Sequence, residues 1–176
     1  TDAPNYWATA NDHHFLVLFA DPPEKNVPQP GQKNIVNVLD YGADPKGLVA
    51  SDEAINKAVE SCPAKGTVYF PAGKYRIDSS VTLRKPNITL YLEGGAFIQR
   101  INGSGGFVLA ANGLTIKGMG TIEAKSYPLI TGREPISDFR LEGVVLRDSY
   151  ISVNGDYHMI ASLNLNNFLI RNIKGL

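Results

Sequence analysis

Short apolar runs separated by turn-forming residues make up most of this chain. After residue 62 the runs are rich in β-branched and aromatic residues, and Gly, Asn, Asp and Pro punctuate them. This pattern predicts short β-strands and no further helix. One earlier stretch differs, because its apolar residues recur at helical spacing: Ala54, Ile55, Ala58, Val59 and Cys62. It predicts a single amphipathic helix at about residues 52–62.

The ends of this helix are marked in the sequence. Ser51 is a favoured N-cap residue, and the acidic Asp52 and Glu53 suit the positive end of the helix dipole. Pro63 ends the helical pattern. Upstream, the apolar residues within 36–39 predict a strand that leads into a turn.

The β-rich runs repeat along the chain. Four of them begin with the pattern apolar, any, apolar, at Ile88, Leu114, Phe139 and Phe168, and their successive offsets are 26, 25 and 29 residues. A repeat of this length without helices is typical of one coil of a parallel β-helix, in which each coil hydrogen-bonds to its neighbours. We therefore predict a parallel β-helix, with the single helix as its N-terminal cap.

A turn-forming residue stands directly before each of the four runs: Asn87, Gly113, Asp138 and Asn167. Residues of this kind let a chain bend between two faces of a solenoid. A β-sandwich is the alternative all-β fold, but it does not predict a shared register at this spacing.

The first part of the chain has a different composition from the coils. Phe15 to Phe19 form a short apolar run that predicts a buried strand, and Asp21 to Lys33 contain four prolines, as in a linker. We expect residues 1–33 to be a leader strand with a Pro-rich linker, and residues 34–176 to form the coils. The leader would either pack on the coils or end an upstream β-sandwich.

Composition narrows the set of partners. Lys and Arg together number 17, as do Asp and Glu, so no long-range field attracts nucleic acid or an anionic membrane, and we expect neither as a partner. The only cysteine, Cys62, excludes an internal disulfide and a zinc site built from several thiolates. His13 and His14 are adjacent and would point to opposite faces of a strand, so we expect no metal site and no cofactor.

Several segments together resemble the opening of pectin-degrading β-helix enzymes of the polygalacturonase kind, in the pectate lyase superfamily. These segments are Val38 to Gly47, Ser51 to Cys62, Gly66 to Tyr75, Leu90 to Ala96, Gly118 to Glu123 and Leu146 to Tyr150. The resemblance implies that the parallel β-helix is right-handed. It also implies the N-terminal part of a polysaccharide-degrading glycoside hydrolase, whose complete form acts on an acidic polymer such as polygalacturonan. It also implies an extracellular or periplasmic location.

The short catalytic motifs of polygalacturonases are absent from this chain. None of Asn-Thr-Asp, Asp-Asp, Gly-His-Gly and Arg-Ile-Lys occurs in it. Glycosidic hydrolysis needs two positioned carboxyl groups, one as acid and one as base or nucleophile. We therefore assign no catalytic residue, and we expect a chain that is truncated before its catalytic carboxylates and is inactive by itself.

The same resemblance suggests where a polysaccharide substrate binds. It places the segment from Ser149 to Asp156 on the substrate-facing sheet, with Glu123 one coil earlier. We expect Tyr150 to stack on a sugar ring and Asn154 to hydrogen-bond sugar hydroxyls, with Glu123 as a third substrate-binding residue. The alternative is that these side chains only cover the outside of the solenoid.

Two other functions stay open. One is a dextranase-like β-helix glycanase that acts on a neutral glucan and follows a β-sandwich. The other is a non-catalytic structural or glycan-binding β-helix. In each case Phe168, Ile170 and Ile173 fall in a last coil whose inward faces need cover. We expect the C-terminal remainder of the β-helix or another copy of the chain to provide that cover.

Overall fold

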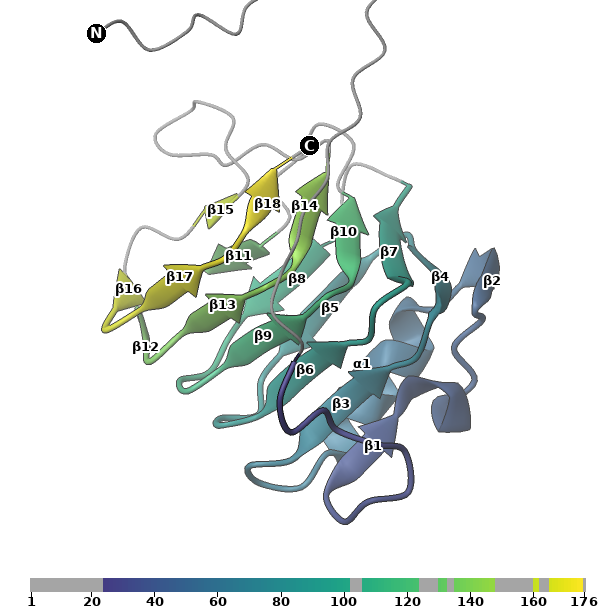
Figure 1. The fold of residues 1–176 in the computed structure, drawn as a ribbon, viewed down its shortest axis with the longest axis horizontal. Coiled ribbons are helices and arrows are strands. Elements are labelled where there is room, and N and C mark those ends of the chain that lie inside the picture. The colour runs from purple at the N-terminus through teal and green to yellow at the C-terminus, as the bar shows by residue number, and fades with distance from the viewer. Residues whose placement is uncertain are drawn as a thin grey trace, which may run out of the picture.

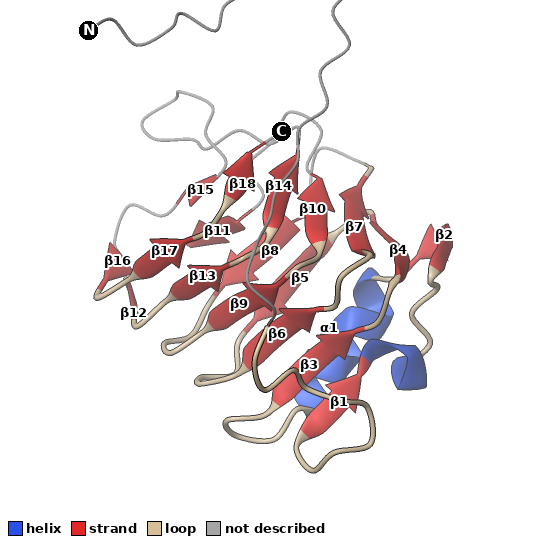
Figure 2. Cartoon of the chain, viewed as in Figure 1, coloured by secondary structure: helices blue, strands red, loops and turns tan. Residues whose placement is uncertain are grey.

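The computed structural model describes residues 24–101, 106–123, 130–132, 135–147, 160–161 and 165–175. Their strands pair in parallel and wind into a solenoid of stacked coils, with one α-helix near the N-terminal end (Figures 1 and 2). The predicted parallel β-helix is therefore confirmed. No helix among these residues is long and apolar enough to cross a membrane.

Three sheets and one short strand pair make up the coils. Sheet A contains, in spatial order, β1 (Ile35–Asn37), β3 (Thr67–Phe70), β6 (Thr89–Leu92), β9 (Thr115–Gly118), β13 (Arg140–Glu142) and β17 (Leu169–Arg171). Sheet B contains β18 (Lys174–Gly175), β14 (Val145–Arg147), β10 (Thr121–Glu123), β7 (Ala96–Arg100), β4 (Gly73–Ile77) and β2 (Lys46–Ala50). Sheet C contains β15 (Ile160–Ala161), β11 (Ile130–Gly132), β8 (Gly106–Leu109) and β5 (Ser80–Leu83), and β12 (Ile136–Ser137) pairs with β16 (Leu165–Asn166).

The core consists of columns that run along the solenoid axis. In sheet A, the inward-facing Val68, Leu90, Ile116 and Leu141 are aligned in register and fully buried. Because neighbouring strands lie about 4.7–4.9 Å apart, these side chains stack directly on one another. Full burial of an aliphatic side chain of this size contributes roughly 1.5–3 kcal/mol. The columns therefore hold successive coils in a single register.

The turns that lead into sheet A depend on residues that tolerate a left-handed backbone. Asn87, Gly113, Asp138 and Asn167 have φ of 59°, 70°, 61° and 50°, as their positions before the repeated runs predict. The turns also bond to each other, because the N–H of Gly113 donates to the carbonyl of Ser137 in the next coil (2.9 Å). Each turn thus repeats the bend of the one before it.

The helix α1 (Asp52–Ser61) covers the first coils, as predicted. Its buried side chains are those that the helical spacing indicated: Ala54, Ile55, Ala58 and Val59. The N-cap differs in detail from the prediction. Ser51 occupies the cap position, but its hydroxyl accepts a hydrogen bond from the N–H of Asp44 (2.9 Å) and makes no capping bond to the helix.

The first strand, predicted within residues 36–39, ends earlier than predicted. β1 ends at Asn37, and a 3-10 helix, η1 (Val38–Tyr41), takes up the next residues. The side chain of Asn37 accepts a hydrogen bond from the N–H of Leu39 (3.0 Å), which turns the chain out of the strand. Gly42, with φ 92°, follows η1 as its C-cap.

The described part of the predicted linker packs against the coils. Residues 24–33 precede β1, and the segment passes over the outer side of sheet A (Figure 1). There Glu24 accepts a hydrogen bond from the hydroxyl of Tyr91 in β6 (2.6 Å). The predicted leader strand, Phe15 to Phe19, lies outside the described residues, so a boundary near residue 34 stays a prediction.

The last coil carries exposed apolar side chains. β17 and β18 are terminal strands of sheets A and B, and Phe168 and Ile170 are 56% and 39% exposed. Ile173 is partly buried against the core. The expected cover for this coil, a further part of the β-helix or another copy, stays a prediction.

Gly118 at the end of β9 provides a test of the coil geometry. Its φ is 126°, and a Cβ there would overlap the carbonyl oxygen of Leu92. We expect Gly118→Ala to lower the free energy of unfolding by at least about 2 kcal/mol, because both the backbone angle and the contact are unfavourable. At Gly94, the control, a Cβ would meet only Met119, at 3.9 Å. Gly94→Ala should change the stability by less than about 0.5 kcal/mol. Urea unfolding measures the stability of both variants, and equal losses of stability would contradict this geometry.

Candidate functional site

A row of polar side chains crosses the outer face of sheet B. Arg76, Gln99, Glu123 and Arg147 occupy the same register position in β4, β7, β10 and β14. Their strand neighbours, such as Ile98 and Ile122, are buried in the core, so these four positions alternate to the outer side. We call this row the polar stripe. It runs along the solenoid axis, with about 4.7–4.9 Å between successive members.

Hydrogen bonds and ion pairs connect the stripe. The amide nitrogen of Gln99 donates to Oε2 of Glu123 (2.5 Å), and Nε of Arg147 lies 3.6 Å from Oε1 of the same carboxylate. Arg76 makes two bonds to Asp78, at 2.8 and 2.5 Å, and these bonds raise the pKa of the guanidinium. Glu123 is 5% exposed, whereas the side chain of Arg147 is 53% exposed. Glu123 therefore holds its neighbours in place, while Arg147 can reach a ligand.

The stripe contains one of the three predicted substrate-binding residues. Glu123 lies on sheet B, whereas Tyr150 and Asn154 lie outside the described residues, so their approach to Glu123 stays a prediction. The other members of the row, Arg76, Gln99 and Arg147, were not predicted as site residues from the sequence. These residues could have been found by following the position of Glu123 through the repeat, since in-register coils align equivalent residues.

The chemistry of the stripe suits binding better than bond cleavage. Two described carboxylates lie at the stripe: Glu123 within it, and Asp78 next to its member Arg76. Each of them faces a guanidinium. A glycosidase instead needs an acid and a base or nucleophile on either side of the scissile bond. Guanidinium groups and a side-chain amide donate hydrogen bonds to sugar hydroxyls and to carboxylates. Within the described ranges, no group of three His, Cys, Asp or Glu side chains could hold a metal ion.

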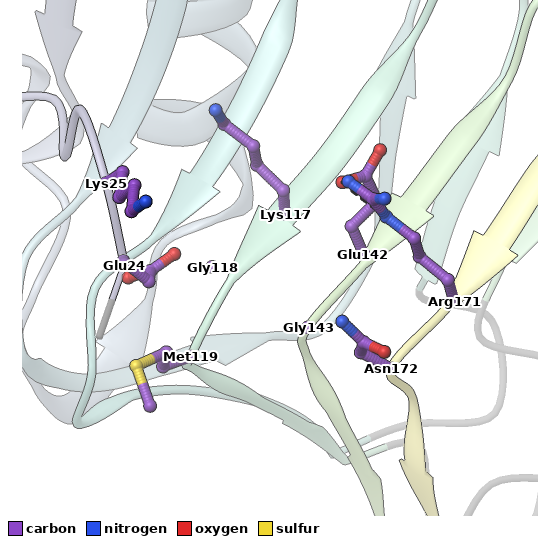
Figure 3. Close-up of a pocket in the computed structure, with 9 residues that line it drawn as sticks. All are labelled: Glu24, Lys25, Lys117, Gly118, Met119, Glu142, Gly143, Arg171 and Asn172. Carbon is purple, nitrogen blue, oxygen red and sulfur yellow. Dashed lines mark hydrogen bonds and ion pairs between the residues drawn. The ribbon is translucent and has the colours of Figure 1, made fainter. Parts of the chain in front are cut away.

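A separate pocket of about 300 Å³ lies over sheet A (Figure 3). It is lined by Glu24, Lys25, Lys117, Gly118, Met119, Glu142, Gly143, Arg171 and Asn172. The N-terminal segment forms one side, and the ends of β9, β13 and β17 form the other. On the strand side, Arg171 donates to Oε2 of Glu142 from Nε at 3.1 Å and from Nη2 at 2.8 Å. This pocket is therefore on a different face of the solenoid from the polar stripe.

Two stacked tyrosines lie beside this pocket on sheet A. The rings of Tyr69 and Tyr91 are 5.7 Å apart with an interplanar angle of 15°. Both residues occupy strand positions that alternate with the inward-facing core residues, yet each is only 2% exposed. Burial, reinforced by the carboxylate of Glu93, raises the pKa of Tyr69 to about 12. Burial also raises the pKa of Tyr91, together with its bond to Glu24. These shifts favour the neutral phenols in the folded protein.

The raised pKa values of the buried tyrosines predict a loss of stability at alkaline pH. Burial and Glu93 also raise the pKa of Tyr75 to about 12, so Tyr69 and Tyr75 stay protonated in the folded chain while unfolded tyrosines ionise near 10. The free energy of unfolding should therefore fall as the pH rises from about 10 to about 12. Tyr69→Phe should flatten this fall, because one ionisation is removed from the unfolded chain. Parallel stability curves for the two proteins, measured by urea unfolding at each pH, would contradict the burial of Tyr69.

The in-register coils define a parallel β-helix, and the polar stripe places hydrogen-bonding side chains along one of its outer faces. A model of the family described as rhamnogalacturonase A/epimerase, pectate lyase-like, matches residues 35–174. The chain belongs to this family. The resemblance to β-helix enzymes of the polygalacturonase kind is thereby confirmed.

Individual relatives are distant and longer. Rhamnogalacturonase A of Aspergillus niger is 24% identical over 128 residues, which cover 64% of this chain and 29% of that protein. The chain thus spans less than a third of the length of this curated relative. An iota-carrageenase solved with iota-carrageenan fragments shares the fold with a TM-score of 0.62 at 16% identity, over 89% of this chain and 40% of that one. A Yersinia enterocolitica family 28 exopolygalacturonase gives a TM-score of 0.53 at 15% identity, over 81% of this chain and 43% of that one.

Proposed function

We propose that this chain is the N-terminal part of a polysaccharide-degrading β-helix glycanase, and that its polar stripe binds an acidic, pectin-type polymer. The observation that carries the proposal is the row of Arg76, Gln99, Glu123 and Arg147 on one outer face. A row along the solenoid axis matches the extended shape of a polysaccharide. The family supports the same class of substrate, since its members include rhamnogalacturonase A.

The charges of the stripe favour an acidic polymer over a neutral one. Arg147 is the half-exposed cation of the row, and its planar guanidinium can bind a sugar carboxylate through two hydrogen bonds. Glu123 orients Arg147 and Gln99 in this scheme and accepts bonds from them. Tyr150 follows Arg147 by three residues in the sequence. We propose that Tyr150 stacks on a sugar ring beside the stripe and that Asn154 binds hydroxyls.

The catalytic carboxylates belong, in this proposal, to a part of the protein beyond this chain. The substrate also implies that the protein acts outside the cell or in the periplasm. A glycan-binding β-helix without catalysis is the second candidate, because both described carboxylates at the stripe are engaged with arginines. A dextranase-like enzyme is the third, and it differs in preferring a neutral polymer.

Loss of the exposed cation should weaken binding of an acidic polymer selectively. We expect Arg147→Gln to weaken binding to polygalacturonan by at least about threefold at low salt, because a charge-assisted contact is lost. Arg84→Gln is the matched control, because Arg84 is an exposed arginine that follows β5 of sheet C. Affinity electrophoresis in gels containing polygalacturonan or dextran measures both variants. Stronger retention in dextran than in polygalacturonan would instead support the dextranase-like enzyme.

The isolated chain should release no reducing sugar. We expect no activity on polygalacturonan or rhamnogalacturonan, because both described carboxylates at the stripe are paired with arginines and no acid and base pair is positioned there. A reducing-end assay against a heat-inactivated sample measures this. Activity that survives repeated purification would contradict the absence of catalytic carboxylates. The same assay on the whole protein separates a glycanase from a non-catalytic glycan-binding protein.

A further inference from the structure

The pocket over sheet A has no role in the function proposed for sheet B. We propose that it is a second saccharide site, which takes a short, singly charged acidic sugar such as a uronic acid. The site would lie on a different face from the polar stripe and does not depend on what the stripe binds. Four observations support this proposal. Two lysines of the lining make no ion pair with a described residue, and its two acids already accept hydrogen bonds. Two glycines leave bare backbone in the floor, and the volume of the pocket suits a short saccharide.

The uncommitted charges of the pocket are positive. Lys25 and Lys117 line it from opposite sides, and the side chain of neither makes a hydrogen bond or ion pair with a described residue. The two acids of the lining are already engaged, because Glu24 accepts from Tyr91 and Glu142 accepts from Arg171. An anion in the pocket would therefore gain two ammonium partners without breaking an existing ion pair.

The floor of the pocket is backbone without side chains. Gly118 and Gly143 lie in consecutive coils, and a Cβ at Gly143 would come within 2.6 Å of the carbonyl oxygen of Gly118. The close approach of the coils thus requires glycine at both corners, and this part of the lining presents only backbone. Met119 and Asn172 lie beside the two glycines (Figure 3). They add an apolar surface and an amide, the mixture that a sugar ring with its hydroxyls requires.

The volume of the pocket and the mixture of positive and negative side chains that line it indicate which ligand fits. A volume of about 300 Å³ is at the small end of ligand pockets and suits a short saccharide. The carboxylates of Glu24 and Glu142 can accept bonds from hydroxyls, but they would repel a compact dianion such as phosphate. A ligand with one negative charge and several hydroxyls satisfies both the lysines and the acids.

The test is a titration followed by amide chemical shifts in two-dimensional NMR. Galacturonate should shift the amides of Lys117, Gly118 and Gly143 saturably, whereas galactose and inorganic phosphate at equal concentration should shift them much less. A galacturonate titration of the Arg147→Gln variant separates binding at this pocket from binding at the polar stripe. The amides of the sheet A pocket should respond in that variant as they do in the wild type.

Lysine variants decide whether the pocket itself binds. Lys117→Gln and Lys25→Gln should each raise the dissociation constant for galacturonate by about threefold or more. Lys57→Gln on α1 is the control and should leave it unchanged, since its charge pairs only with Glu53 at the surface. If Lys117→Gln does not give a folded spectrum, Lys25→Gln on the N-terminal segment carries the test. Equal shifts with galactose or phosphate, no saturable shift, or unchanged binding in the lysine variants would each overturn the proposal.

Discussion

Parallel, in-register pairing between successive coils places each strand position directly above its counterpart in the coil before. This pairing stacks Val68, Leu90 and Ile116 into one inward column. Because strands alternate between their two faces, it also forces an outward column at the next position. The same constraint that builds the core therefore arranges the surface, and a change of register by one residue would exchange the two.

The outward columns differ in character between the sheets. On sheet B the column is the polar stripe, held together by the carboxylate of Glu123. On sheet A the equivalent column passes from the stacked Tyr69 and Tyr91 to Lys117. The N-terminal segment meets this second column through Glu24, and the pocket opens where that contact ends. One fold thus carries two chemically distinct outer surfaces, and we propose that each binds carbohydrate.

Local signals in the sequence predict the coils well. The repeat offsets and the turn residues Asn87 and Asp138 reflect geometry that recurs in every coil, so one sequence contains several copies of the evidence. The change from strand to 3-10 helix after Asn37 was missed because a single side-chain hydrogen bond causes it. The bond between Glu24 and Tyr91 joins residues 67 positions apart, and no periodic pattern indicates such a contact.

We propose that an acidic polysaccharide lies along the outer face of sheet B. A galacturonate oligomer that carries a nitroxide spin label tests it directly, because the label broadens the amide signals of nearby residues. We expect broadening along the strand ends of β7, β10 and β14, including the amides of Gln99 and Arg147. Broadening confined to β5 and β8 of sheet C, or broadening equal to that from a labelled neutral glucan, would contradict it.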